Sequence, residues 1–146
     1  MTMKEETKVI YEKPIPLKNT YNAPYWDAAD RHELNVQKCN TCSNYNHPPG
    51  PSCANCGSID VIWENLGSTI TGEVYTYIVS NRPFLPGFQN ELPTVIAVVQ
   101  LEDYPDIKII GNVLHGNMET VSIGTKVKMV WIEATEERAI PQWVLV

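Results

Sequence analysis

The second half of the chain alternates between apolar and polar positions in the way that β-strands do. From residue 71 onward, short runs rich in β-branched and aromatic residues are separated by Gly, Pro, Asn and Asp. The alternation is clearest in residues 125–133, where Val127, Met129 and Trp131 face one way and lysines face the other. The pattern predicts five strands, at residues 71–80, 94–102, 106–114, 125–133 and 140–146.

Five short strands within residues 67–146 suit a small Greek-key barrel of the OB type. Such a barrel has room for a short helical turn after its third strand, and residues 115–124 could form one. His115 would end that strand, and a structural role is the simplest interpretation of a lone histidine there. Two polar segments, which contain Glu102, Asp103, Asp106, Glu136, Glu137 and Arg138, are expected to be exposed turns.

One connection in this barrel is unusually long. Residues 81–93 join the first two barrel strands and place Phe84, Leu85 and Phe88 in exposed positions among prolines. Long loops in compact domains are usually either functional or disordered. Because the aromatic and proline content argues against disorder, we interpret this loop as functional.

Upstream of the barrel, the pattern predicts an arm and one helix. Prolines would break any helix within residues 1–19, whereas residues 22–34 read as a short helix. Asn22 is a plausible N-cap and Pro24 falls in the first turn, where its missing N–H has no cost. Its apolar side would consist of Tyr25, Trp26, Ala29 and Leu34. This side could pack on the protein's own core or against another subunit, and His32 would be a solvated surface residue.

Every cysteine of the chain lies between two short strand-like runs, residues 34–38 and 60–66. The thiols form two Cys-x-x-Cys pairs that are separated by a loop: Cys39, Cys42, Cys53 and Cys56. This spacing is typical of structural zinc, which four thiolates bind as a tetrahedron. Gly57 would relieve the tight turn after the second pair, and Ser43 takes the matching position after the first.

A site filled by four cysteines has no vacant position for water or substrate, so the predicted zinc site is structural. Iron in a rubredoxin-like redox carrier would use the same ligands and remains an alternative. His47 lies in the intervening loop and could replace a ligand, but a surface position is the simpler interpretation. The metal would fold a segment that is too small to hold a core alone.

The N-terminal residues and the hydropathy of the chain bear on its compartment. Residues 1–19 contain no apolar stretch of the kind found in secretory signals, and no run reaches the roughly 18 apolar residues of a membrane span. We therefore expect a cytoplasmic protein without a membrane contact. Because thiols stay reduced in the cytoplasm, metal binding is favoured over disulfide bonds.

Charge argues against a nucleic-acid partner, although the fold would permit one. The formal net charge is −6, and residues 67–146 are net negative. A nucleic-acid-binding OB module with a zinc ribbon is the alternative function, with Tyr75 and Tyr77 as stacking candidates. Such a protein normally needs a basic face, and none is visible here. The sequence also contains no nucleophile motif and no phosphate-binding glycine loop.

The order of these elements resembles domain-of-unknown-function family 35, which joins a rubredoxin-like zinc ribbon to an acyl-CoA-associated OB-fold. The likeness runs from about residue 20 to the end of the chain. It rests on the segments "PYWDAADRHELNVQKCNTC", "HPPGPSCANCGSIDVIWENLGSTITGEVYTYIVS", "LPTVIAVVQLED", "IIGNVL" and "VSIGTKVKMVWIE". The resemblance implies a mainly β chain with an N-terminal arm and helix (1–33), a zinc ribbon (34–66) and a five-stranded OB barrel (67–146).

The resemblance also implies an accessory role beside a thiolase-like enzyme. Members of the family work with catalytic subunits that make or break carbon–carbon bonds next to a coenzyme A thioester. The partner would supply the catalytic residues, while this chain would support the acyl-CoA channel and the assembly, for which a two-plus-two heteromer is the expectation. Residues expected to lie near the partner or CoA are Trp26, Arg82, Phe84, Leu85 and Phe88. Trp63, Trp131 and Trp143 are expected in the core.

Overall fold

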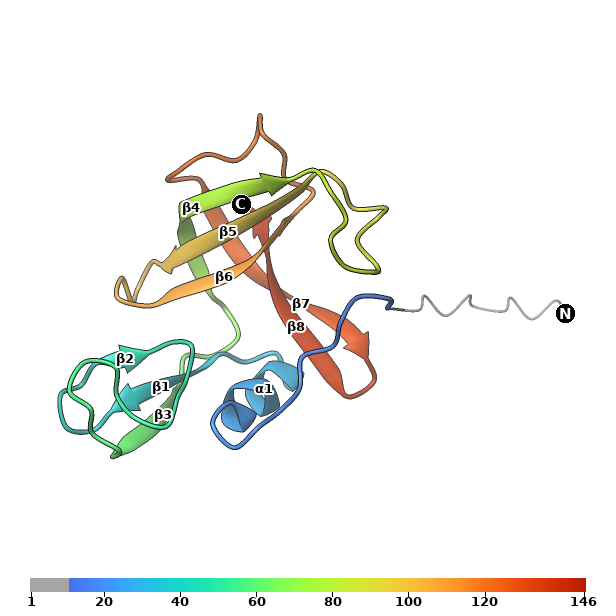
Figure 1. Ribbon diagram of the computed structural model, residues 1–146. Helices are drawn as coiled ribbons and strands as arrows, with labels where there is room; N and C mark the ends of the chain where they lie inside the picture. The colour runs from blue at the N-terminus through green and yellow to red at the C-terminus, as the bar shows by residue number, and fades with distance from the viewer. Residues whose placement is uncertain (1–10) are drawn as a thin grey trace, which may run out of the picture.

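The computed structural model describes residues 11–146 as a mainly β protein with one short helix (Figure 1). In this view the small sheet lies below the barrel, and the helix lies between the small sheet and the last hairpin of the barrel. This arrangement confirms the predicted fold class. In chain order the elements are α1 (Ala23–Asp30), β1 (Asn35–Cys39), β2 (Tyr45–Asn46), β3 (Val61–Asn65), β4 (Thr71–Ser80), β5 (Thr94–Leu101), β6 (Lys108–Leu114), β7 (Lys126–Thr135) and β8 (Arg138–Leu145).

The barrel is closed in the order β4-β5-β6-β8-β7, which confirms the five predicted strands. All neighbours are antiparallel except β6 and β8, which run parallel and pair only at Val113–Trp143 and Leu114–Val144. Inward-facing residues alternate along each strand and fill the barrel with Val, Ile, Met and one fully buried Trp143. Val127 and Met129 are buried at the barrel centre as the alternation predicted, whereas Trp131, assigned to the same face, is only partly buried.

The small sheet has the order β2-β1-β3 and carries the cysteines at one end. Strand β2 is only two residues long and was not predicted, because so short a segment shows no alternation. Strands β1 and β3 were predicted and pair over five residues, from Asn35–Asn65 to Cys39–Val61. Trp63 is half-buried and packs on the edge of the core instead of lying within it.

Helix α1 packs on the chain's own core. Tyr25, Ala28 and Ala29 are buried, which decides between the two environments that the sequence left open for the apolar side. Asn22 is the N-cap residue, as predicted, but its side chain does not cap the helix, because its Oδ1 accepts from Asn19 N at 2.7 Å. The helix ends at Asp30, before the predicted residue 34, and His32 adopts a left-handed backbone with φ 61°.

The outer turn at Arg138 is not the exposed segment that the sequence suggested. Arg138 opens β8, and its guanidinium lies 3.1 Å from Asp30 Oδ1, with both side chains mostly buried. Asp30 Oδ1 also accepts from the backbone N–H of Ala139 at 3.1 Å. The carboxylate therefore ties the end of α1 to the β7–β8 hairpin across more than one hundred residues of sequence, which no local pattern could indicate.

Residues 115–124 contain the predicted helical turn as a single turn, in which Val121 N donates to Asn117 O at 3.0 Å. Two smaller expectations differ from the structure. His32 is not simply solvated, because its ring stacks on Trp131 at 6.0 Å and bonds to Glu133. Trp131 is consequently half-buried and not a core residue. His115 does end its strand, in an exposed position. Among residues 11–146, no helix is long and apolar enough to cross a membrane.

Candidate metal centre and adjoining cavity

The four cysteine sulfurs converge on one point at the end of the small sheet. All four Sγ atoms lie within 4.8 Å of one another. Cys39 and Cys56 are 3.6 Å apart, and Cys42 and Cys53 are 3.7 Å apart, measured between their sulfurs. A tetrahedron with Zn–S bonds of about 2.3 Å has S–S edges of about 3.8 Å. The donor set and its spacing therefore fit a tetrathiolate zinc ion.

The two cysteine turns are near copies of each other. In the first, Cys39 O accepts from Ser43 N and Cys39 N donates to Asn44 O, at 2.9 and 2.8 Å. In the second, Cys53 O accepts from Gly57 N and Cys53 N donates to Ser58 O, at the same two distances. Ser43 and Gly57 both have a left-handed backbone, with φ 64° and 77°. The expected equivalence of these two positions is confirmed.

Backbone hydrogen-bond donors lie beside two of the four sulfurs, those of Cys39 and Cys53, and favour their thiolate form. Backbone N–H groups of Cys42 and Asn55 lie 3.4 Å from the sulfurs of Cys39 and Cys53. The pKa of Cys53 is lowered to about 6, chiefly by the backbone N–H of Cys56 and also by the Asn46 amide, against the opposing effect of burial. Donors of this kind stabilise a thiolate that holds a cation.

His47 does not belong to this cluster, and it is not the surface residue that the sequence suggested. Its ring is largely buried and lies 5.3 Å from the ring of Tyr25, and its Nδ1 is enclosed without a hydrogen-bond partner. Burial lowers the pKa of His47 to about 4, so the imidazole is neutral near pH 7. Tyr25, which packs against this ring, lies more than twenty residues away in sequence, which a loop composition cannot reveal.

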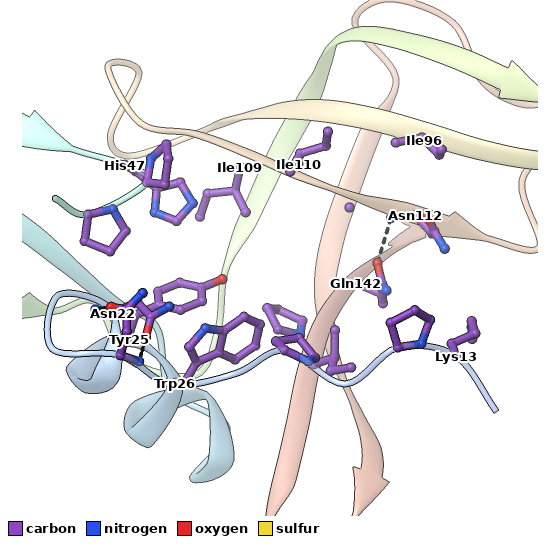
Figure 2. A pocket seen from close by; sticks show the side chains of 18 of the residues that line it. Lys13, Asn22, Tyr25, Trp26, His47, Ile96, Ile109, Ile110, Asn112 and Gln142 are labelled. Carbon is purple, nitrogen blue, oxygen red and sulfur yellow. Dashed lines mark hydrogen bonds between the residues drawn. The ribbon is translucent and has the colours of Figure 1, made fainter. Parts of the chain in front are cut away.

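A cavity of about 670 Å³ opens beside His47, between the two halves of the fold (Figure 2). Strands β5 and β6 form one wall, and α1 with the N-terminal arm forms the facing wall. The ribbon loop that contains His47 closes one end. Its volume lies within the range of small-molecule sites in proteins. The cavity therefore brings together segments that lie far apart in the sequence.

Side chains of different character line the two walls. Ile96, Ile109 and Ile110 project from the sheet, while Tyr25 and Trp26 project from the helix. Polar groups are few: Asn112 and Gln142 lie toward the arm, where Asn112 N donates to Gln142 Oε1 at 2.6 Å. Neither was singled out in the sequence, because each sits inside an otherwise apolar strand.

The long loop 81–93 borders this cavity on its outer side. Phe84 and Leu85 are 82% and 53% exposed, as expected, whereas Phe88 turns toward the arm and lies under Lys13 Nζ at 5.4 Å. Lys13 also forms a 2.8 Å ion pair with Glu91. A second hollow, of about 140 Å³, lies between this loop and β5.

The sequence-predicted partner residues thus fall on one side of the molecule. Trp26, Leu85 and Phe88 line the large cavity, and Arg82, Phe84, Leu85 and Phe88 line the smaller one. Trp26 is half-buried, with the Arg138 guanidinium 5.4 Å from its ring. Trp26 therefore forms part of the cavity wall and offers little surface to a partner, whereas Phe84 is exposed to solvent.

Comparison with known proteins agrees with this geometry. Residues 26–61 match the rubredoxin-like zinc ribbon domain of ChsH2, and residues 63–132 match its C-terminal OB-fold domain. The solved Ltp2–ChsH2(DUF35) aldolase contains a chain 35% identical to this one, with a TM-score of 0.74 over 89% of this chain and 98% of that chain. The chain belongs to the ChsH2 (DUF35) family. The resemblance predicted from the sequence is confirmed.

Two longer relatives carry functional names. A probable enoyl-CoA hydratase alpha subunit of Thermomonospora curvata is 36% identical over 140 residues, which is 96% of this chain and 42% of that protein. The 3-oxo-4,17-pregnadiene-20-carboxyl-CoA hydratase alpha subunit of Mycobacterium tuberculosis is 28% identical over 130 residues, or 89% of this chain and 38% of that protein. The chain thus spans about two fifths of the length of these relatives.

Proposed function

We propose that this chain is a non-catalytic, zinc-binding subunit of a complex with a thiolase-like enzyme that acts on β-oxoacyl-CoA thioesters. The observation that carries the proposal is the convergence of all four thiols on one closed cluster. Among residues 11–146, no serine, lysine or free thiol is hydrogen-bonded to a histidine, so no activated nucleophile is visible. The catalytic groups would come from the partner.

Cys39, Cys42, Cys53 and Cys56 would hold the zinc ion. When bound, zinc supplies folding energy to the ribbon and no open coordination position for a reaction. The backbone N–H groups of Cys42 and Asn55 favour the thiolate form of Cys39 and Cys53. The ribbon in turn holds the loop with His47 against the barrel, so the metal acts on the cavity only through the fold.

The exposed end of loop 81–93 is the proposed contact with the catalytic subunit. Phe84 and Leu85 present apolar surface to solvent, and aromatic side chains of this kind dominate binding energy at protein interfaces. Arg82 lies beside them and would meet a CoA phosphate or a carboxylate of the partner. The names of the relatives support this view, because two of them are alpha subunits of hydratases with CoA in their names and the solved structure is an aldolase that contains two named components.

Co-expression with a thiolase encoded beside this chain in its native genome tests the proposal. The two proteins are expected to elute together from a sizing column, and the complex is expected to turn over a β-oxoacyl-CoA that neither subunit converts alone. Phe84→Asp should weaken the complex at least tenfold, whereas Ile123→Asp, at an equally exposed isoleucine outside this loop, should not. Separate elution together with full activity of the thiolase alone would contradict the proposal.

One observation favours the alternative of a nucleic-acid-binding OB module. Tyr75 is 53% exposed on the barrel, and Lys108 Nζ lies 4.9 Å from its ring, which is the combination that single strands use for stacking. The negative charge of the chain opposes this function. Retention of single-stranded DNA at low salt, lost on Tyr75→Ala, would favour the alternative. An iron-containing redox carrier would be visible from the colour of the purified protein.

A further inference from the structure

We propose that the cavity between α1, the ribbon loop and strands β5 and β6 is a binding site for a neutral, flat, ring-bearing ligand that carries a carbonyl group. The inference deepens the proposed function, since the acyl group of a thioester can supply such a ring. It can be tested on this chain alone. Its failure would leave the proposed assembly with a thiolase untouched.

The shape of the cavity selects a flat ligand. Two walls face each other across it, with Ile109 on the sheet side and Tyr25 and Trp26 on the helix side (Figure 2). Ile96 and Ile110 line the cavity from the other face of their strands. The remaining surface is rich in proline rings, from the arm, the ribbon loop and β8. A slot between an aliphatic and an aromatic wall buries both faces of a ring system, whereas a flexible chain would lose conformational entropy on entering it.

The charges around the cavity select a neutral ligand. Lys13 is the only Lys, Arg, Asp or Glu among its lining residues in the described part of the chain. That ammonium already pairs with Glu91 at 2.8 Å, so no free charge remains for a phosphate or an ammonium group. A phosphate-bearing nucleotide therefore does not fit this slot, and the nucleotide end of a CoA thioester would have to lie outside it.

His47 supplies the feature that selects a carbonyl. The imidazole is neutral and carries one ring proton. Its Nδ1 is enclosed without a partner, whereas its Nε2 is not enclosed and has no partner among residues 11–146. Because buried N–H groups without an acceptor are rarer than unused lone pairs, we place the proton on Nε2. This N–H can donate to a ligand oxygen, as can the side-chain amide nitrogens of Asn112 and Gln142.

The cavity wall next to the arm is preformed. Gly87 lies so close to the arm that a Cβ on it would be 2.6 Å from Lys13 N. The ion pair between Lys13 and Glu91 and the contact of Lys13 with Phe88 also hold the arm against loop 81–93. A site that is already closed on this side loses little free energy to ordering when a ligand binds.

Four probes test the proposal by titration calorimetry on the zinc-loaded chain. 2-Acetylnaphthalene has the flat rings and the carbonyl, and 2-dodecanone has the same carbon count and carbonyl without rings. 2-Ethylnaphthalene keeps the rings without the carbonyl, and free CoA is the anionic control. We expect 2-acetylnaphthalene to bind at least tenfold tighter than 2-dodecanone and about fivefold tighter than 2-ethylnaphthalene, the latter being the value of one hydrogen bond. Equal binding of all three neutral probes, or tighter binding of CoA, would overturn the proposal.

Variants place the binding in this cavity. Ile110→Lys places a charge on an exposed strand position at the opening of the cavity. This variant should weaken the binding of 2-acetylnaphthalene at least tenfold. Ile78→Lys is the matched control, since Ile78 is equally exposed on the same sheet but lies outside the cavity. His47→Leu should remove the preference for 2-acetylnaphthalene over 2-ethylnaphthalene. Binding that is unaffected by Ile110→Lys would refute the assignment even if the probes rank as expected.

Two sources could provide such a ring, namely an acyl thioester or a free neutral compound. 2-Naphthoyl-CoA distinguishes them. If it binds and is weakened by Ile110→Lys to the same degree as 2-acetylnaphthalene, the cavity takes the acyl group. If only the free ketone binds, the ligand is a free ring compound.

Discussion

Ser43→Gly and Gly57→Ser, one in each cysteine turn, should change the free energy of unfolding in opposite directions. Ser43 and Gly57 occupy equivalent left-handed positions, but only Ser43 carries a side chain. Holding an L-residue in this conformation costs roughly 1–2 kcal/mol, of which glycine's greater freedom in the unfolded chain offsets about 0.5–1. The Ser43 side chain is exposed and forms no hydrogen bond with residues 11–146, so its removal breaks no contact among them. Ser43→Gly should therefore raise the free energy of unfolding by about 0.5–1 kcal/mol.

Gly57→Ser should lower the free energy of unfolding by a similar amount. A Cβ at Gly57 would meet no atom within 4 Å, so only the backbone conformation opposes it. The double variant should return close to the parent stability. The assay is urea unfolding of the zinc-loaded protein, followed by tryptophan fluorescence at fixed zinc concentration. A Ser43→Gly variant that is no more stable than the parent would refute the reasoning.

Three further predictions concern the metal, the buried histidine and the arm. A strong chelator should release the bound zinc and unfold residues 35–66, as measured by loss of amide-exchange protection in the ribbon. Cys53→Ser should cause the same loss of protection without a chelator. The pKa of His47 is lowered to about 4, so on acidification the unfolded state binds a proton at this histidine before the folded state does. The free energy of unfolding should therefore fall as pH drops from about 6.5 toward 4, by at most about 1.4 kcal/mol per pH unit, and His47→Gln should flatten that slope. Equal slopes of the two proteins in urea titrations would contradict this. Gly87→Ala should detach the arm and expose the bond after Tyr11 to chymotrypsin, whereas Gly124→Ala, with a similar φ but open space around it, should not.

The barrel and the metal cluster were predictable because their signals are local. Alternation along each strand marks the inner face, and the spacing of the Cys-x-x-Cys pairs fixes the donor set. Even the equivalence of Ser43 and Gly57 followed from counting positions after each cysteine pair. In these cases the residues that determine the structure lie within a few positions of one another.

The cavity was not predictable because it forms between segments far apart in the chain. His47 looked like a surface residue until Tyr25 was seen to cover it, and Arg138 looked like part of a turn until Asp30 was placed beside it. Gln142 gave no signal at all, since its role depends on the register between β8 and β6. Polar residues whose partners come from another element are the ones that a single sequence does not reveal.

The hydrogen bonds at the base of the ribbon have a consequence for how the protein can be engineered. Leu34 N donates to Gly67 O at 2.9 Å and Leu66 N donates to Leu34 O at 2.7 Å, so the polypeptide enters and leaves the small sheet at one spot. The whole ribbon is therefore joined to the barrel at a single paired segment, so it could be replaced by another ribbon without moving the barrel strands. Such an exchange would alter the loop with His47 at one end of the cavity while leaving strands β5 and β6 in place, which offers a route to a different ligand selectivity.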